Sequence, residues 1–250
     1  MSENQKKVWI TGASSGIGKA VAEKFAKEGW RVAVSARRKE ILDDMAKNQN
    51  IFSFPLDVIN EENCFQTFQK IISEFTEIDL CIFCSGTYDP KKEKEIDLKQ
   101  NRFVMDVNYF GVLNCVKTVE KYFKDKKRGH ISIVSSIAGY RGLPNSSGYG
   151  PSKAALNNFA ESIFFDFKKF NVRISVISPG FIKTPLTDKN DFPMPFLRST
   201  EFAAEKIYVG LTKSNSFEIH FPKQLTLILK FLRILPYKIY LFLIYKLYKR

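Results

Sequence analysis

A glycine-rich turn between an apolar strand and a helix is the feature that most constrains how this chain folds. Residues 7–11 form a short apolar run, and Gly12, Gly16 and Gly18 follow directly. Residues 19–28 then show the pattern of a helix. A strand, a glycine turn and a helix in this order are typical of a site that binds a dinucleotide, with the pyrophosphate at the N-terminus of the helix.

Each of the three glycines has a separate physical reason in such a site. Gly12 permits the tight turn, Gly16 lets the backbone approach the pyrophosphate, and Gly18 allows close packing of the helix. The spacing here is G-x-x-x-G-x-G instead of G-x-G-x-x-G. The alternative is a purely structural turn, which rarely needs three glycines so close together.

Apolar runs and helical patterns alternate along the rest of the chain. Further strands are predicted at residues 31–36, 51–54, 79–83, 131–136 and 172–177, and helices at residues 61–75, 103–123 and 149–170. This alternation predicts an α/β fold with a single doubly wound parallel sheet of Rossmann type, joined by right-handed crossovers. We expect residues 1–220 to form this domain and residues 221–250 to form a basic, amphipathic, helical C-terminal extension.

Ligands of doubly wound sheets bind beyond the carboxyl ends of the strands. The turn at residues 12–18, Arg37, Gly86, Ser136 and Pro179 all fall at such ends. We therefore expect them to converge on one cleft. The charged residues 89–97 are predicted to be a surface loop.

The end of the second strand indicates which dinucleotide binds. An NAD site usually places an acid there, which accepts a hydrogen bond from the ribose 2′-hydroxyl. This chain has Ala36 at that position, followed by Arg37 and Arg38. Since no carboxylate repels a 2′-phosphate, the sequence favours NADP(H) over NAD(H). The alternative is a solvated basic loop.

Tyr149 and Lys153 lie four residues apart at the start of the predicted helix at residues 149–170. Helical spacing places both side chains on one face, and an ammonium beside a phenol favours the phenolate. Pro151 fits the first turn of a helix, where its missing N–H has no intrahelical partner to lose. Ser136 ends the preceding strand, where its hydroxyl can share a carbonyl oxygen with Tyr149. Taken alone, such a Tyr–Lys pair is usually a solvated helix face.

Taken together, these motifs resemble the short-chain dehydrogenase/reductase family over roughly residues 6–220. The residues that carry the resemblance are Thr11-Gly-Ala-Ser-Ser-Gly-Ile-Gly18, Asn108, Ser136, Tyr149-x-x-x-Lys153 and Pro179-Gly180 with Thr184. The resemblance implies a domain that binds NAD(P), with Tyr149 as the catalytic acid/base. It implies that Lys153 lowers the pKa of Tyr149 and holds the nicotinamide ribose, that Ser136 orients the substrate oxygen, and that Asn108 shapes a helix that supports a proton-relay water.

The same resemblance implies a set of cofactor contacts and contains one departure. The cofactor-binding residues are expected to be Gly12, Ser14, Ser15, Gly16, Ile17, Gly18, Arg37, Arg38, Asp57, Val58, Ser85, Gly86, Asn108, Tyr149, Lys153, Pro179, Gly180, Ile182 and Thr184. The family usually has Asn-Ala-Gly after the fourth strand, whereas this chain has Cys84-Ser85-Gly86. The departure concerns packing near the adenosine half of the cofactor rather than the chemistry.

Residues 181–198 contain three prolines and little periodicity. In the family this position is a mobile loop over the substrate. The expected apolar lining is Phe181, Leu186, Phe192, Met194 and Phe196. The alternative is a structural loop that packs its own apolar side chains.

The net charge of +13 is concentrated in the C-terminal extension, because residues 221–250 hold seven Lys or Arg and no acid. The longest uncharged stretch among the later basic residues spans residues 239–245, far shorter than a membrane-crossing helix. Basic and aromatic residues on short helices suit peripheral membrane contact through residues 224–250, and similar tails occur in bacterial members of the family that act on lipophilic carbonyls. The alternative is packing against the protein's own cleft or a second subunit. Nucleic-acid binding is not expected, since the basic residues are interleaved with aliphatic ones.

The cysteines and histidines suggest neither a disulfide framework nor a metal site. Cys81 and Cys84 form a C-x-x-C motif inside an apolar strand, where residues three apart point to opposite faces. His130 and His220 fall outside the cluster of candidate residues and are interpreted as structural. The start of the chain shows no signal peptide, which favours a cytoplasmic protein, or one that is peripheral at the inner face of a membrane.

The expected activity is the NADPH-dependent reduction of an apolar, lipid-derived ketone or aldehyde to the alcohol. One alternative is a 3-oxoacyl reductase of fatty-acid synthesis, and another is a module that senses NADP(H) without catalysis. The helical patterns at residues 103–123 and 152–170 carry apolar residues on more than one face, which predicts a homodimer or homotetramer.

Overall fold

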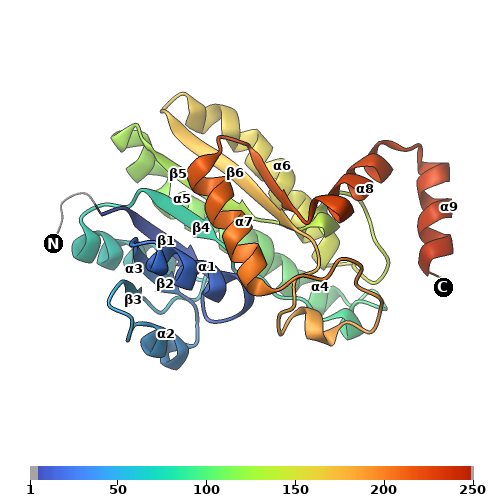
Figure 1. Ribbon diagram of the computed structural model, residues 1–250, viewed down its shortest axis with the longest axis horizontal. Helices are drawn as coiled ribbons and strands as arrows, with labels where there is room; N and C mark the ends of the chain where they lie inside the picture. The colour runs from blue at the N-terminus through green and yellow to red at the C-terminus, as the bar shows by residue number, and fades with distance from the viewer. Residues whose placement is uncertain (1–4, 249–250) are drawn as a thin grey trace.

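A parallel seven-stranded sheet forms the centre of the protein, and the computed structural model describes residues 5–248 (Figure 1). The strand order in the described part is β3-β2-β1-β4-β5-β6-β7. The strands are β1 (Lys7–Thr11), β2 (Arg31–Ser35), β3 (Ile51–Ser53), β4 (Leu80–Phe83), β5 (Gly129–Val134), β6 (Val172–Pro179) and β7 (Glu218–Phe221). The predicted doubly wound parallel sheet is confirmed.

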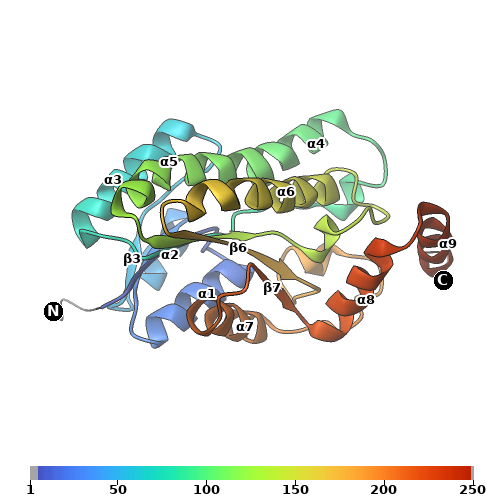
Figure 2. The same cartoon turned by 90° about the horizontal axis from the view of Figure 1, so that it is seen from above.

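Helices cover both faces of the sheet (Figure 2). One face packs against α1 (Gly16–Lys27), α2 (Lys39–Met45) and α7 (Thr200–Lys213), and the other against α3 (Glu61–Phe75), α5 (Gly111–Lys126) and α6 (Tyr149–Lys168). Strand β1 shows why a sheet covered on both faces is stable: Val8 and Ile10 belong to the core on one face, and Trp9 belongs to the core on the other. Because successive side chains alternate between the faces, a strand covered on both sides is apolar throughout.

The same alternation separates the two cysteines of the C-x-x-C motif. Cys81 lies in the core beside α3 and α5, whereas Cys84 packs against the core beside α1. All four cysteines are free. The expected packing role is therefore consistent with the structure.

The predicted helix at residues 103–123 is longer and less regular than its periodicity indicates. It is built from α4 (Leu98–Met105), a π-helical turn (Asp106–Phe110) and α5. A π-helical turn adds a residue to the helical repeat, so a period of 3.6 cannot locate it. The turn contains Asn108, which is fully buried.

The segment at residues 89–97 is mostly exposed, as expected of a surface loop, but part of it is ordered and buried. The segment contains a short 3₁₀ helix (Pro90–Lys92), and Glu93 is only 3% exposed. A buried carboxylate needs hydrogen-bond partners, which the site below supplies.

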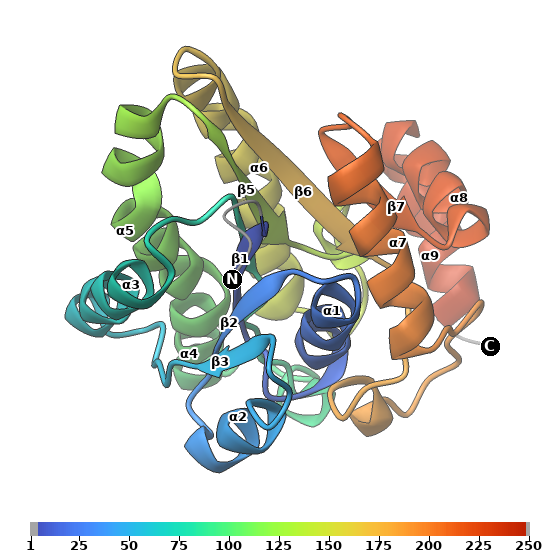
Figure 3. The same ribbon diagram turned by 60° about the vertical axis from the view of Figure 1, so that its left-hand side comes forward.

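The C-terminal extension consists of α8 (Lys223–Ile234) and α9 (Tyr237–Tyr248), which lie beyond β7 at one end of the molecule (Figure 3). Helix α9 stands away from the sheet (Figures 1 and 2). The expectation of a helical extension is confirmed. Lys249 and Arg250, which belong to the predicted membrane contact, lie outside the described residues, as do residues 1–4 of the predicted domain.

Candidate active site

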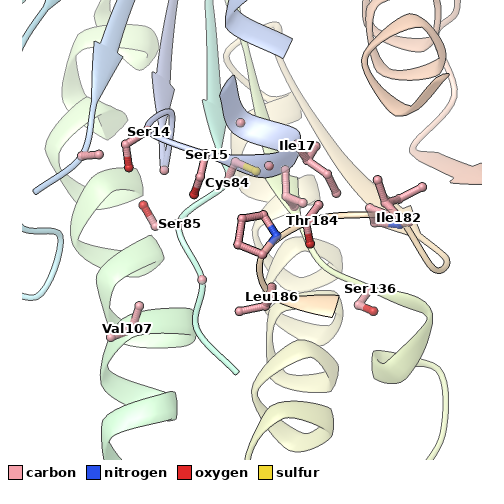
Figure 4. Close-up of a pocket in the computed structure, with 18 of the residues that line it drawn as sticks. Ser14, Ser15, Ile17, Cys84, Ser85, Val107, Ser136, Ile182, Thr184 and Leu186 are labelled. Atoms are coloured by element: carbon pink, nitrogen blue, oxygen red, sulfur yellow. The ribbon is translucent and has the colours of Figure 1, made fainter. Parts of the chain in front are cut away.

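A cavity of about 430 Å³ lies at the carboxyl ends of the strands (Figure 4). Ser14 and Ser15 stand at one side of it, while Ser136 and Ile182 stand at the other. Its wall contains every predicted cofactor-binding residue except Asn108: Gly12, Ser14, Ser15, Gly16, Ile17, Gly18, Arg37, Arg38, Asp57, Val58, Ser85, Gly86, Tyr149, Lys153, Pro179, Gly180, Ile182 and Thr184. The fold thus brings together residues that are far apart in the sequence.

Gly12 and Gly18 are required in the turn because neighbouring backbone occupies the space that side chains would need. A Cβ atom on Gly18 would lie 2.3 Å from the Gly12 carbonyl oxygen, so α1 packs directly on the turn. Gly12 has a φ of +69°, and a Cβ atom there would lie 2.7 Å from the Cys84 carbonyl oxygen. Helix α1 therefore begins at the cavity wall, where its N-terminus favours phosphate. These residues fit a dinucleotide.

Arg38 is the arginine that reaches the glycine turn. Its Nη2 donates to the hydroxyls of Ser14 and Ser15, each at 2.9 Å, and its Nε donates to Ser14 at 3.2 Å. Arg37 is exposed and also lines the cavity, next to Ala36. The positive end of the site thus contains two guanidinium groups, and Arg38 is the more firmly held of the two.

Ser136, Tyr149 and Lys153 meet at the opposite end of the cavity. Ser136 follows β5, and its hydroxyl, which accepts from the Ala138 N–H at 3.2 Å, forms a hydrogen bond with the Tyr149 phenol. Lys153 is 4% exposed, and its Nζ donates to the Val134 carbonyl at 2.9 Å. The ammonium lies 5.7 Å from the centroid of the Tyr149 ring. The helical spacing of Tyr149 and Lys153 thus places both side chains beside Ser136 in one polar cluster of the cavity wall.

Burial opposes the expected lowering of the Tyr149 pKa by Lys153. Loss of hydration raises the pKa of Tyr149 to about 12, although its hydrogen bond with Ser136 acts in the opposite direction. Burial also lowers the pKa of Lys153 to about 8. At neutral pH the two side chains therefore meet as a neutral phenol and an ammonium that is more acidic than that of a free lysine.

Asn108 lies behind the cavity wall rather than in it. Its Oδ1 accepts from the Thr87 N–H at 2.7 Å, and its Nδ2 donates to the Thr87 carbonyl and to Ser152 Oγ, each at 3.0 Å. The amide therefore joins the segment after β4 to the helix that carries Tyr149. Asn108 is a positioning residue in this structure, and its predicted contact with the cofactor stays a prediction.

Glu93 and Tyr88 were missed by the sequence interpretation. The Glu93 carboxylate accepts from the backbone N–H groups of Gly148 and Tyr149 at 3.0 and 3.1 Å, which are otherwise unpaired at the start of α6. The ring centroid of Tyr88 lies 4.8 Å from that of Tyr149. Burial raises the pKa of Glu93, and its carboxylate also raises the pKa of Tyr149. The sequence offered no signal, because an isolated glutamate in a charged segment normally faces water.

Residues 181–198 divide between the cavity and their own packing. Of the five predicted apolar lining residues, Leu186 lines the cavity, whereas Phe181, Phe192, Met194 and Phe196 do not. The Phe181 and Phe192 rings pack together with centroids 6.1 Å apart, and Asn190 Nδ2 contacts the Met194 sulfur at 3.2 Å. Such contacts are hard to predict because prolines interrupt helices and strands. The segment then has no periodic pattern from which its buried side chains could be identified.

Both histidines lie in structural settings. His130 Nε2 lies 2.8 Å from Ser175 Oγ, and burial lowers the His130 pKa to about 3. His220 Nδ1 lies 2.7 Å from Thr226 Oγ1. The structural interpretation of both side chains is consistent with these contacts.

Comparison with known proteins decides the family. The sequence profile described as short chain dehydrogenase matches residues 6–193. The chain belongs to the short-chain dehydrogenase/reductase family of oxidoreductases. An uncharacterised oxidoreductase of Myxococcus xanthus is 34% identical over 232 residues, which cover 91% of each chain. The 3-oxoacyl-[acyl-carrier-protein] reductase of Thermotoga maritima is 32% identical over 190 residues, 72% of this chain and 75% of that one.

A solved structure of the family has the same fold and a defined ligand. The structure of ElxO with NADP bound superposes with a TM-score of 0.76 at 27% identity, covering 86% of this chain and 97% of that one. The cavity of this oxidoreductase therefore lies in a fold known to hold a nicotinamide dinucleotide.

Proposed function

We propose that this oxidoreductase reduces an apolar ketone or aldehyde with NADPH. The observation that carries the proposal is the arrangement of the cavity, with two arginines at one end and the Ser136–Tyr149–Lys153 cluster at the other. A bound nicotinamide would supply hydride to the carbonyl carbon. The glycine turn and the N-terminus of α1 would hold its phosphates, and Lys153, with three N–H donors, would hold its ribose.

The residues of the chain then have distinct roles at the carbonyl oxygen. Ser136 donates a hydrogen bond to that oxygen and stabilises the negative charge that develops there. Tyr149 transfers its proton to the same oxygen. Because burial keeps the Tyr149 pKa near 12, the phenol is protonated at neutral pH and is ready to act as an acid.

The preference for NADPH is supported by charge at the end of β2. Arg37 and Arg38 line the cavity where a carboxylate would otherwise bind the ribose 2′-hydroxyl. The 2′-phosphate of NADPH pairs well with a guanidinium fork. The binding of NADP by the related ElxO agrees with this proposal.

An apolar substrate is supported by the side chains around the catalytic cluster. Ile182, Pro185 and Leu186 line the cavity, and a separate apolar cluster of Ile137, Tyr140 and Leu225 packs beside Ser136. A 3-oxoacyl thioester is the second candidate, because the related Thermotoga protein is a 3-oxoacyl reductase. A module that only senses the cofactor gains nothing from a buried lysine with a lowered pKa. The predicted homo-oligomer stays a prediction.

Oxidation of NADPH with a panel of aldehydes and ketones of increasing chain length tests the activity, and a 3-oxoacyl thioester tests the second candidate. We expect kcat/KM to rise with chain length. Arg38→Ala should raise the KM for NADPH about tenfold or more and leave that for NADH nearly unchanged. Lys70→Ala, at an exposed position on α3, is the matched control. Equal effects on both cofactors contradict the assignment of the 2′-phosphate.

A further inference from the structure

Helices α8 and α9 expose an unusually apolar surface for the end of a chain. On α8, Leu227, Phe231 and Ile234 are 56%, 61% and 76% exposed and fall on one stripe of the helix. On α9, Leu241, Phe242 and Leu247 are 59%, 57% and 63% exposed. Large contiguous apolar surfaces of this kind mark binding sites.

The two helices are nevertheless held firmly against the body of the protein. The guanidinium of Arg141 donates to the carbonyls of Leu232, Arg233 and Leu235, which closes the end of α8. Tyr240 is 3% exposed, and its hydroxyl donates to the Gly142 carbonyl at 2.6 Å. The exposed side chains are therefore presented by a fixed scaffold rather than by a frayed end.

Charge indicates what covers this surface. Arg233, Lys238 and Lys246 are exposed among the apolar side chains, and residues 221–250 contain no acid. The last acid before this segment, Glu218 on β7, is already engaged by Lys230 and by the Tyr140 hydroxyl. An apolar surface whose own charged side chains are all cations is complementary to anionic lipid headgroups above hydrocarbon.

A second copy of the chain fits this surface less well. A symmetric dimer places the same patch of each subunit against its counterpart. Two basic, acid-free patches would then face each other, which costs repulsion without any carboxylate to offset it. The long basic side chains can instead extend to headgroups while their stems stay in apolar surroundings.

Helices α8 and α9 are each too short to cross a bilayer. Helix α9 has 12 residues, about 18 Å of helix, whereas a bilayer core is about 30 Å thick. Within the described chain, no helix has both the length and the apolarity to cross a membrane. An apolar helix of this length suits a position in the plane of the interface.

We propose that α8 and α9 bind the surface of an anionic lipid bilayer. Arg141 and Gly142, which anchor the two helices, follow the segment that begins at Ser136. The bound bilayer would therefore adjoin the substrate side of the cavity. The binding itself does not depend on the proposed activity.

Flotation of the full-length protein with phosphatidylcholine vesicles, with and without phosphatidylglycerol, tests the proposal. We expect flotation only with the anionic vesicles, and weaker flotation at high salt. Lys238→Glu with Lys246→Glu should weaken binding about tenfold or more, and so should Leu241→Gln with Phe242→Gln. The matched controls are Lys27→Glu with Lys70→Glu on α1 and α3, and Phe165→Gln on α6, where the side chain is 68% exposed.

Three outcomes overturn the proposal. The first is no flotation with anionic vesicles. The second is equal loss of flotation in the control variants. The third is a concentration-dependent dimer in sedimentation measurements that is abolished by Leu241→Gln with Phe242→Gln, together with no flotation of the wild type or any variant. That result would assign the surface to a second copy of the chain.

Discussion

Helices α6 and α9 each contain an aromatic residue and a lysine four positions apart, yet the pairs Tyr149–Lys153 and Phe242–Lys246 have opposite environments. In α6, Lys153 Nζ lies 5.7 Å from the centroid of the Tyr149 ring. In α9, Lys246 Nζ lies 4.9 Å from the centroid of the Phe242 ring. Lys153 is 4% exposed, whereas Phe242 is 57% exposed. The local geometry is similar, so the surroundings decide what each pair does.

The pair in α6 is surrounded by groups that change its acidity. Burial lowers the Lys153 pKa to about 8 and raises that of Tyr149 to about 12. The pair in α9 is in water, where a contact between a cation and a ring contributes only about 0.5–1 kcal/mol. A tyrosine and a lysine at helical spacing therefore acquire shifted pKa values such as those in α6 only where the fold excludes water from them.

Tyr149→Phe should show the largest difference between the two pairs. We expect turnover to fall about 10³-fold, because the proton donor is lost, while NADPH binding measured by fluorescence titration changes less than about twofold. Tyr237→Phe removes the same hydroxyl from α9, where the side chain is 75% exposed, and should leave turnover unchanged. Turnover retained in Tyr149→Phe rules out its role as the acid.

Lys153→Met should lower kcat/KM by about 10²-fold and should also change how stability depends on pH. The unfolded chain keeps its lysine proton up to about pH 10.5, whereas the folded protein loses it near pH 8. Between these values the unfolded state binds more protons, so this group makes the wild type more stable as pH rises.

Thermal unfolding of wild type and Lys153→Met from pH 6 to pH 10 measures this effect. We expect the wild type to gain stability relative to the variant above pH 8. Lys246→Met on α9 is the control and should show a constant difference from wild type. A constant difference for Lys153→Met as well contradicts the shifted pKa.

Glu93→Gln should have a smaller effect on both stability and the pH profile. Loss of the charge at the start of α6 should reduce the free energy of unfolding by about 1 kcal/mol. The Tyr149 pKa should fall, because the Glu93 carboxylate raises it, so the alkaline limit of reduction should move to lower pH. Asp97→Asn, which changes the N-terminal cap of α4, should affect stability without moving that limit. If the alkaline limit of reduction does not move in Glu93→Gln, the Glu93 carboxylate does not influence the Tyr149 pKa.

Phe242→Ala should have the smallest effect on the fold. Because its side chain is exposed, we expect the free energy of unfolding to change by less than about 0.5 kcal/mol. Phe167→Ala, at a position of α6 that is 2% exposed, should cost about 3–5 kcal/mol. Denaturant titration measures both, and a large loss in Phe242→Ala indicates that α9 is packed in solution.

The strands, the glycine turn and the grouping of Ser136, Tyr149 and Lys153 in one cavity could be predicted because their signals are local. Residues 8–10 are apolar without interruption, and Tyr149 and Lys153 are one helical turn apart. Asn108 was also recognised, and its expected effect on the shape of its helix is consistent with the structure, but its hydrogen bonds were not predicted. A π-helical turn and three hydrogen bonds to Thr87 and Ser152 place its side chain behind the wall, and neither feature leaves a periodic trace.

The sequence by itself determined the order of strands and helices along the chain, the position of the glycine turn and the spacing of Tyr149 and Lys153, because each depends on residues close together in the chain. Only the tertiary structure decided the acidity of Tyr149, the burial of Glu93 and the arginine that reaches the glycine turn. These depend on which distant groups exclude water from a side chain or hydrogen-bond to it. The electrostatic free energy of a side chain changes steeply when water is excluded from it. The order of residues along the chain alone therefore does not predict these properties.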